Sequence, residues 1–294
     1  MITAAAVHSM AGGCAAPDWP ALNAAEVRTV LRALGLSTRG LVLRWISPRP
    51  LSAAALVSAD GHGAIALGEW TYEVHEQGEG KDVYRRMVSW APFRHREHAV
   101  AAGRALARLH CGARGYGAPA RSARILVSND AIIGSTDPTS AMEQRIAGST
   151  ALRACFGRGT WRQAVQQAWL PWHGAYRDLH PQLERLWTHN DWHSSNLLWS
   201  NAGRDADLAA ALLRGYLAER PLAPLERRAV LAVLPIVHVG YALAEVEYFH
   251  GITRSAANAE LAFKAFLLGH CQWFDAPQGH DFLRSLQAQL GAPT

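Results

Sequence analysis

Lysine is nearly absent from this chain of 294 residues: it occurs only at Lys81 and Lys264, which leaves twenty-seven arginines among the 29 basic residues. The formal net charge is +5. Nucleic-acid binding would require basic residues clustered with interleaved aromatics. The arginines are instead scattered along predicted helices, so we expect no nucleic-acid partner.

Cysteine and long apolar runs are scarce as well. The four cysteines are widely separated and form no C-x-x-C pair, which excludes the common zinc motifs and a dense disulfide framework and favours free thiols in the cytoplasm. No segment approaches about 18 uninterrupted apolar residues, so we expect no membrane span. With 49% apolar and 18% charged residues, the composition is that of a globular protein, long enough for about two domains.

Residues 1–75 are expected to form a leader, one helix and a small, reduced sheet. Helical periodicity covers residues 21–36. Short apolar segments separated by turn residues then predict antiparallel strands at 41–45, 54–58, 64–67 and 71–75. Asp60-Gly61 predicts a hairpin between the second and third of these strands.

Residues 76–294 are expected to form a larger helical lobe. Apolar periodicity predicts helices at 97–110, 161–177, 205–219, 225–248, 256–270 and 280–290. One segment, residues 187–200, interrupts this pattern: it is apolar at both ends and polar in the middle, which predicts a strand, an exposed loop and a second strand. The fold class is therefore α+β, with a small antiparallel-sheet lobe followed by a helical lobe.

The loop within 187–200 concentrates polar side chains, and two chemistries use such a set. In phosphoryl transfer, a carboxylate orients and deprotonates the attacking hydroxyl, and an amide five residues later binds magnesium. In metal hydrolysis, His189, Asp191 and His193 would ligate a first-row metal. Asp191 and Asn196 have the five-residue separation, and apolar residues follow at 197–199, so the spacing favours phosphoryl transfer.

The string His189-Asn190-Asp191, with His193 and Asn196 after it, resembles the catalytic loop of the aminoglycoside phosphotransferase and choline kinase families, which are small-molecule relatives of protein kinases. Glycine usually stands in those families where this chain has Asn190. Two earlier stretches are similar in the same order. Residues 105–110 resemble the helix that precedes the catalytic loop, and residues 70–75 resemble the hinge strand.

The resemblance implies a protein-kinase-like fold that transfers a phosphoryl group from ATP or GTP, with Mg²⁺, to a hydroxyl of a small molecule. Asp191 would be the catalytic base, with His189 and His193 beside it. Asn196 would be one magnesium ligand and Asp207 the other. The acidic residues near 207 also fit an ordinary helix start, where carboxylates cap the first turn.

The resemblance also suggests where the two substrates would bind. The backbone of Glu73, Val74 and His75 would meet the adenine at the hinge, whereas the helices at 205–290 would hold the phosphate acceptor. Trp192 flanks the proposed site, and Tyr241 and Glu245 recur at helical spacing, so these three residues are candidates to line a pocket for a cationic or hydroxylated substrate. The helical spacing also fits the semi-polar seam of a packed helix. An aminoglycoside, a choline-like amine, an amino-acid alcohol and a sugar all remain open.

Two elements of the family are missing from the sequence. No lysine that could hold the nucleotide phosphates lies between Val57 and Thr71, and there is no room there for the helix that carries its glutamate partner. No Asp-Phe-Gly-type segment follows the loop. A kinase-like binding protein without catalysis is therefore one alternative, and a His/Asp metal hydrolase is a less favoured one.

Overall fold

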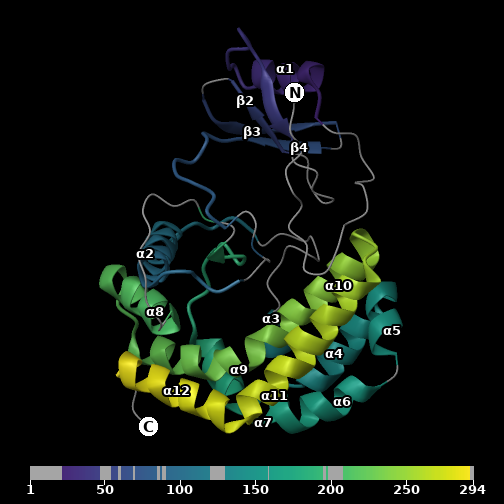
Figure 1. Cartoon of the computed structure of the whole chain (residues 1–294), viewed down its shortest axis with the longest axis vertical. Coiled ribbons are helices and arrows are strands. Elements are labelled where there is room, and N and C mark those ends of the chain that lie inside the picture. Colours follow the sequence, from purple (N-terminus) through teal and green to yellow (C-terminus); the bar gives the residue numbers. More distant parts are fainter. Residues whose placement is uncertain are drawn as a thin grey trace.

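The computed structural model describes residues 22–46, 54–58, 61–68, 70–84, 87, 91–119, 130–157, 159–194, 197 and 208–291. It consists of a small part with one helix and four strands and a larger part built from helices (Figure 1). The last strand ends at Val74 and the first long helix of the larger part begins at Arg96. A mostly helical chain with small antiparallel sheets is what the sequence predicts.

The strands of the small part form two separate pairs. β1 (Leu43–Ile46) pairs antiparallel with β2 (Ala55–Val57), and β3 (Gly63–Leu67) pairs antiparallel with β4 (Trp70–Val74). The hairpin predicted at Asp60-Gly61 is wrong, because β2 and β3 do not pair within the described part of the chain. The tight connection lies one strand later: Gly68 has a φ of 61°, which suits the two-residue link between Leu67 and Trp70.

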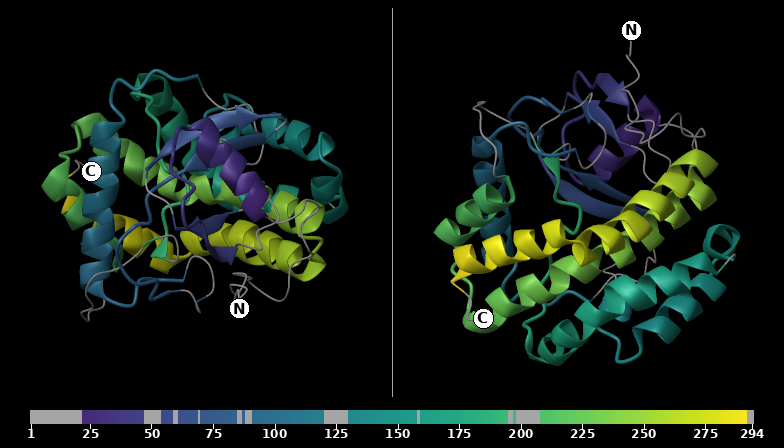
Figure 2. Two further views of the ribbon diagram at one scale, coloured as in Figure 1. Left: turned by 90° about the horizontal axis from the view of Figure 1, so that it is seen from above. Right: turned by 60° about the horizontal axis from the view of Figure 1, so that its bottom comes forward.

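Helix α1 (Ala24–Ala33) covers the strands. Asn23 caps its first turn, because the side-chain oxygen accepts hydrogen bonds from the backbone N–H groups of Ala25 and Glu26, both at 3.0 Å. The helix buries Val27, Val30 and Leu31. It lies on the face of the strands that points away from the larger part (Figure 2).

The regular structure described in the larger part is helical, and every stretch predicted as helical is helical where it is described; residues 205–207 lie outside the described residues. The helices are α2 (Arg96–Gly112), α3 (Asp130–Ile133), α4 (Pro138–Ala147), α5 (Thr150–Phe156), α6 (Thr160–Ala164), α7 (Leu170–Leu179), α8 (Leu208–Glu219), α9 (Pro224–Val246), α10 (Ala256–Leu261), α11 (His270–Asp275) and α12 (Pro277–Leu290). Wider π-helical turns continue some of them, at η1 (Val165–Trp169), η4 (Glu247–Ile252) and η5 (Ala262–Gly269), and the 3₁₀ turn η2 (His180–Gln182) follows α7.

The strand predicted at the start of 187–200 is not formed. Residues 184–193 have no regular structure, because no described strand lies beside them to accept a ladder of hydrogen bonds. The indole N–H of Trp187 donates instead to the carbonyl of Ala118 at 3.0 Å. The second predicted strand, apart from Leu197, lies outside the described residues.

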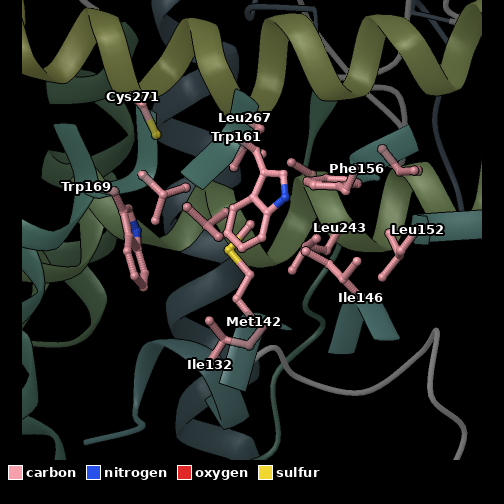
Figure 3. Close-up of a cluster of buried hydrophobic side chains, with 14 of the residues drawn as sticks. Ile132, Met142, Ile146, Leu152, Phe156, Trp161, Trp169, Leu243, Leu267 and Cys271 are labelled. Atoms are coloured by element: carbon pink, nitrogen blue, oxygen red, sulfur yellow. The ribbon is translucent and has the colours of Figure 1, made fainter. Parts of the chain in front are cut away.

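The main core lies where α9 crosses the helices α3–α7 and α10–α11. Trp161 and Trp169 are almost completely buried there, together with Met142 and Leu243 (Figure 3). The indole N–H of Trp169 donates to the carbonyl of Ile236 at 3.0 Å, which satisfies the one polar group of that side chain. This core anchors α9, the helix that carries Tyr241 and Glu245.

The segment Pro224–Ile252, which comprises α9 and η4, has the length and the apolar composition of a helix that could cross a membrane. It has 29 residues, and the mean hydropathy of its most apolar window is 1.9. The sequence contains no uninterrupted apolar run of that length, because polar residues are spaced along the helix. Half of the window is buried inside the molecule, and many of its apolar side chains belong to the core.

Helices α2 and α8 pack unusually close together. A Cβ atom placed on Gly103 of α2 would lie 2.0 Å from the carbonyl oxygen of Leu212, and one placed on Gly215 of α8 would lie 2.1 Å from that of Val100. Only glycine fits at these two positions. His110 and the hydroxyl of Tyr216 add a hydrogen bond of 2.8 Å between the same helices.

Candidate active site

The loop that carries Asp191 is held between α2 and α9. The indole N–H of Trp192 donates to the carbonyl of Ala102 on α2 at 3.1 Å. The hydroxyl of Tyr241 on α9 donates to the side-chain oxygen of Asn190 at 3.1 Å and lies 3.3 Å from its carbonyl oxygen. The hydroxyl of Ser194 donates to the carbonyl of Ala91 at 2.8 Å. The rigid helices therefore fix the loop from both sides.

Asn190 gives the loop its sharp bend. Its φ is 59°, in the left-handed region, where asparagine is the best tolerated residue after glycine. This explains why asparagine can stand where the resembling families have glycine. Just after the bend, the backbone N–H of Asp191 donates to Nδ1 of His189 at 3.3 Å, which leaves Nε2 of a neutral His189 as the protonated nitrogen.

Asp191 and His193 form the central pair of the site. Nε2 of His193 lies 3.2 Å from Oδ1 of Asp191. The side chain of Asp191 is 57% exposed and that of His193 is 13% exposed. The carboxylate is therefore open to a ligand on one side, while the mostly buried imidazole holds its orientation from the other.

Tyr241 and Glu245 of α9 face this pair. Burial, and then the charge of Asp191, raise the pKa of Glu245 to about 8. The same two causes raise the pKa of the Tyr241 hydroxyl. At neutral pH Glu245 is therefore largely protonated, because burial and the nearby Asp191 both disfavour its ionised form.

The magnesium ligands predicted from the loop, Asn196 and Asp207, lie outside the described residues. Among the described side chains of the site, the carboxylate of Asp191 is the kind of hard oxygen ligand that suits Mg²⁺. No group of three or more His, Cys, Asp and Glu side chains that could hold a metal ion occurs in the part of the chain that the structure describes. The cluster expected for a metal hydrolase, with His189, Asp191 and His193 around one ion, is therefore not assembled.

The predicted hinge residues belong to a different cavity. Glu73 and Val74 end β4, and His75 follows it, with its Nε2 3.2 Å from Oε2 of Glu73. They line a cavity of about 540 Å³ between α1, β2 and β4, together with Arg39 and Arg44. Asp191 is not among the residues that line this cavity.

The sequence does not predict two features of the site, the anchoring of the loop and its bend at Asn190. It did not find the anchoring of the loop to α2 and α9, because Ala102 and Asn190 carry no chemical signature. The departure from glycine at Asn190 was the available signal for the bend. Trp192, a predicted pocket residue, donates its N–H to α2, and its ring packs edge-on against His189, with centroids 5.3 Å apart.

Comparison with known proteins gives one match. A family model described as the phosphotransferase enzyme family matches residues 17–213. This range includes the small part, α2, the loop of Asp191 and the first half of α8, but not Tyr241 or Glu245. No curated protein and no solved structure matches the chain.

Proposed function

Because this chain belongs to the phosphotransferase enzyme family, we propose that it transfers the γ-phosphoryl group of ATP or GTP to a hydroxyl of a small molecule. The family implies a protein-kinase-like fold. The observation that carries the proposal is the pair formed by Asp191 and His193, on a loop that lies inside the matched range and is held by α2 and α9.

The described residues serve the acceptor side of such a reaction. The exposed carboxylate of Asp191 accepts the proton of the attacking hydroxyl and orients its oxygen, and His193 holds the carboxylate in place. Mg²⁺, when bound, would offset the charge of the phosphates, and Asn196 and Asp207 are the residues we propose to hold it. The hinge residues Glu73, Val74 and His75 are proposed to contact the nucleotide base.

The substrate class that fits best is an alcohol that also carries an amine. Tyr241 and Glu245 stand beside Asp191 and lie outside the range matched by the family model, so they belong to the part of the chain in which specificity is expected to vary. A cationic amine at this position would stabilise the ionised form of Glu245 and remove the repulsion between the two carboxylates.

Transfer of labelled phosphate from millimolar Mg-ATP to amine-bearing and neutral alcohols, at high enzyme concentration, tests this function. Asp191→Asn should lower the transfer rate by about 10²–10⁴-fold, because the proton acceptor is lost, while the fold is kept. Asp178→Asn is the matched control, since Asp178 is an exposed carboxylate on α7, and it should keep the rate. An Asp191→Asn variant with unchanged transfer would overturn the assignment.

A second candidate is a kinase-like binding protein without catalysis. The observation in its favour is that β2 is followed by β3 with no lysine between Val57 and Thr71, so no lysine from this region can pin the nucleotide phosphates. Saturable binding of an amine-bearing alcohol by the wild-type chain, with no transfer of label at any Mg-ATP concentration, would favour this candidate.

Metal analysis of the purified chain separates both candidates from a metal hydrolase. A site built from Asp and Asn oxygens holds Mg²⁺ weakly and through its waters, so we expect no stoichiometric zinc. One tightly bound zinc ion per chain that is lost in His193→Ala would instead support the hydrolase.

A further inference from the structure

A second cavity, of about 790 Å³, lies behind the loop of Asp191. It is enclosed by α7, α8, α9 and residues 183–190, and both Thr188 and Asn190 line it. Asp191, His193 and Glu245 do not line it, so it is distinct from the candidate active site. Its volume falls in the range of about 300–1,000 Å³ that is typical of small-molecule sites.

Most of the wall of this cavity is apolar, and part of it is aromatic. Tyr116 and Trp187 meet edge to face with their ring centroids 5.9 Å apart, and Tyr116 is 63% exposed, so it forms part of the rim. Helix α9 contributes Ala229, Val230 and Val233 to the opposite wall. A flat apolar ring matches these surfaces, because aromatic side chains bind rings edge-on or by offset stacking.

At the polar end of the cavity, hydrogen bonds link Arg220, Tyr216 and His110. The guanidinium of Arg220 donates to Glu226 at 2.5 Å and to the hydroxyl of Tyr216 at 3.2 Å. The same hydroxyl lies 2.8 Å from Nδ1 of His110 and can donate its proton to that nitrogen. Burial, and then the charge of Arg220, lower the pKa of His110. A neutral ring that accepts from Tyr216 at Nδ1 carries its proton on Nε2.

Two nitrogen atoms beside these hydrogen bonds have no hydrogen-bond partner. Nε2 of His110 and Nε of Arg220 are both buried without a hydrogen-bond partner, and both residues line the cavity. A buried N–H group without an acceptor is unfavourable. Both nitrogens are covered by neighbouring atoms, so an acceptor oxygen brought to this end of the cavity reaches them once the His110 ring or the Arg220 guanidinium turns toward it.

We propose that this cavity is a second binding site and that its ligand is a flat aromatic carboxylate. The apolar walls hold the ring, and the carboxylate accepts from His110 and Arg220. Asn190 lines the cavity and also accepts a hydrogen bond from Tyr241, so an occupied cavity restrains the loop that carries Asp191. The proposal does not depend on phosphoryl transfer.

Calorimetric titration of the full chain with 2-naphthoate and with 2-naphthylmethylammonium tests the site, because the two probes share a ring system and differ in the polar group. We expect 2-naphthoate to bind with one site per chain and the ammonium compound to bind at least tenfold more weakly. Val233→Phe places a ring in the cavity and should weaken 2-naphthoate binding at least tenfold. Leu261→Phe, on an exposed position of α10, is the matched control and should leave it unchanged.

His110→Phe supplies a second variant, because it keeps the size of the ring and removes the donor. It should weaken 2-naphthoate binding several-fold and leave the ammonium compound unaffected. Hydrogen exchange of the backbone amides of residues 184–190 should slow when 2-naphthoate is bound. Absence of saturable 2-naphthoate binding, equal affinity for both probes, or unchanged affinity in both Val233→Phe and His110→Phe would overturn the site. Unchanged exchange would overturn its link to the loop.

Discussion

Glu245 is the residue of the active site at which burial and a neighbouring charge act together most strongly. Its pKa is about 8 in the folded protein, against an ordinary value of 4.5. The folded state therefore keeps a proton that the unfolded chain releases between these two pH values. The stability linked to this proton is fully present below about pH 4.5 and is lost as the pH rises through about 8.

Glu245→Gln should remove this pH dependence, because glutamine resembles the protonated acid and does not titrate. Between about pH 5 and pH 8, the melting temperature of the wild-type chain should fall more steeply with pH than that of the variant. Glu260→Gln is the control. Glu260 is exposed, pairs with Lys264 at 2.6 Å and has a lowered pKa, so it stays ionised across this window. Parallel curves for wild type and Glu245→Gln would contradict the raised pKa.

Comparison of Asp191 and His193 with Tyr241 and Glu245 shows which features of the site the sequence predicts and which it does not. The sequence indicates that Asp191 and His193 share a loop, because the two are neighbours in the chain. It names Tyr241 and Glu245 as candidates from helical spacing, but it does not place them. The hydrogen bond between Tyr241 and Asn190 spans 51 positions, and only the packing of α9 against the core brings those two residues together.

Helices α2 and α8 form the scaffold behind the loop. Their contact is lined by small residues, among them Ala102, Gly103, Ala211 and Gly215. The carbonyl of Ala102 that accepts from Trp192 lies next to Gly103. The separation between these two helices therefore sets the position of the loop, as well as the stability of the larger part.

Gly103→Ala tests this dependence, because the new methyl group would meet the backbone of α8. Such overpacking costs about 1–3 kcal/mol, so the free energy of unfolding in urea should fall by that amount. Gly112→Ala is the matched control in the same helix, where a Cβ atom meets nothing within 4 Å. It should leave stability unchanged or raise it by up to about 1 kcal/mol. Equal effects of the two variants would show that α8 does not sit against Gly103.

Helices and strands were predictable where a local pattern of apolar residues determines them. The apolar periodicity of α2, α9 and α12 identifies these helices, and the alternation in β3 and β4 identifies two strands. Pairing was not predictable, since Asp60-Gly61 is a good turn sequence and yet β3 pairs with β4. The short helices α4 and α5 were missed because their signals are the caps Asp137 and Ser149 rather than a long apolar stripe.

For the molecule as a whole, the sequence predicts a division near residue 75; the last described strand ends at Val74 and the helix α2 begins at Arg96. The sequence could not locate the cavities, because each is lined by segments far apart in the chain. Eighteen described residues between Val27 and Gln77 line the cavity beside β4, and nineteen between His110 and Val233 line the cavity behind the loop. Asp191 and His193, which we propose for the acceptor side, are described in the structure, whereas the nucleotide side lacks the lysine that the family resemblance implies.

The absence of a phosphate-binding lysine leads to a prediction about the affinity of the chain for nucleotide. Phosphoryl transfer relies on positioning the phosphates and offsetting their charge. No lysine lies between Val57 and Thr71, and no Asp-Phe-Gly-type segment follows Asn196. Arg44 lines the cavity shared with the hinge residues, but the planar fork of arginine replaces the point charge of lysine poorly.

We therefore expect the chain to bind Mg-ATP with a Kd in the millimolar range or weaker, equivalent to about −4 kcal/mol, and to show negligible turnover at micromolar Mg-ATP. Titration calorimetry measures the affinity directly, and Arg44→Ala is the informative companion. With a weak wild type, Arg44→Ala should change little, since no strong phosphate contact is there to lose. Micromolar binding by the wild type would contradict the prediction. Loss of that binding in Arg44→Ala would identify Arg44 as the residue that has replaced the lysine.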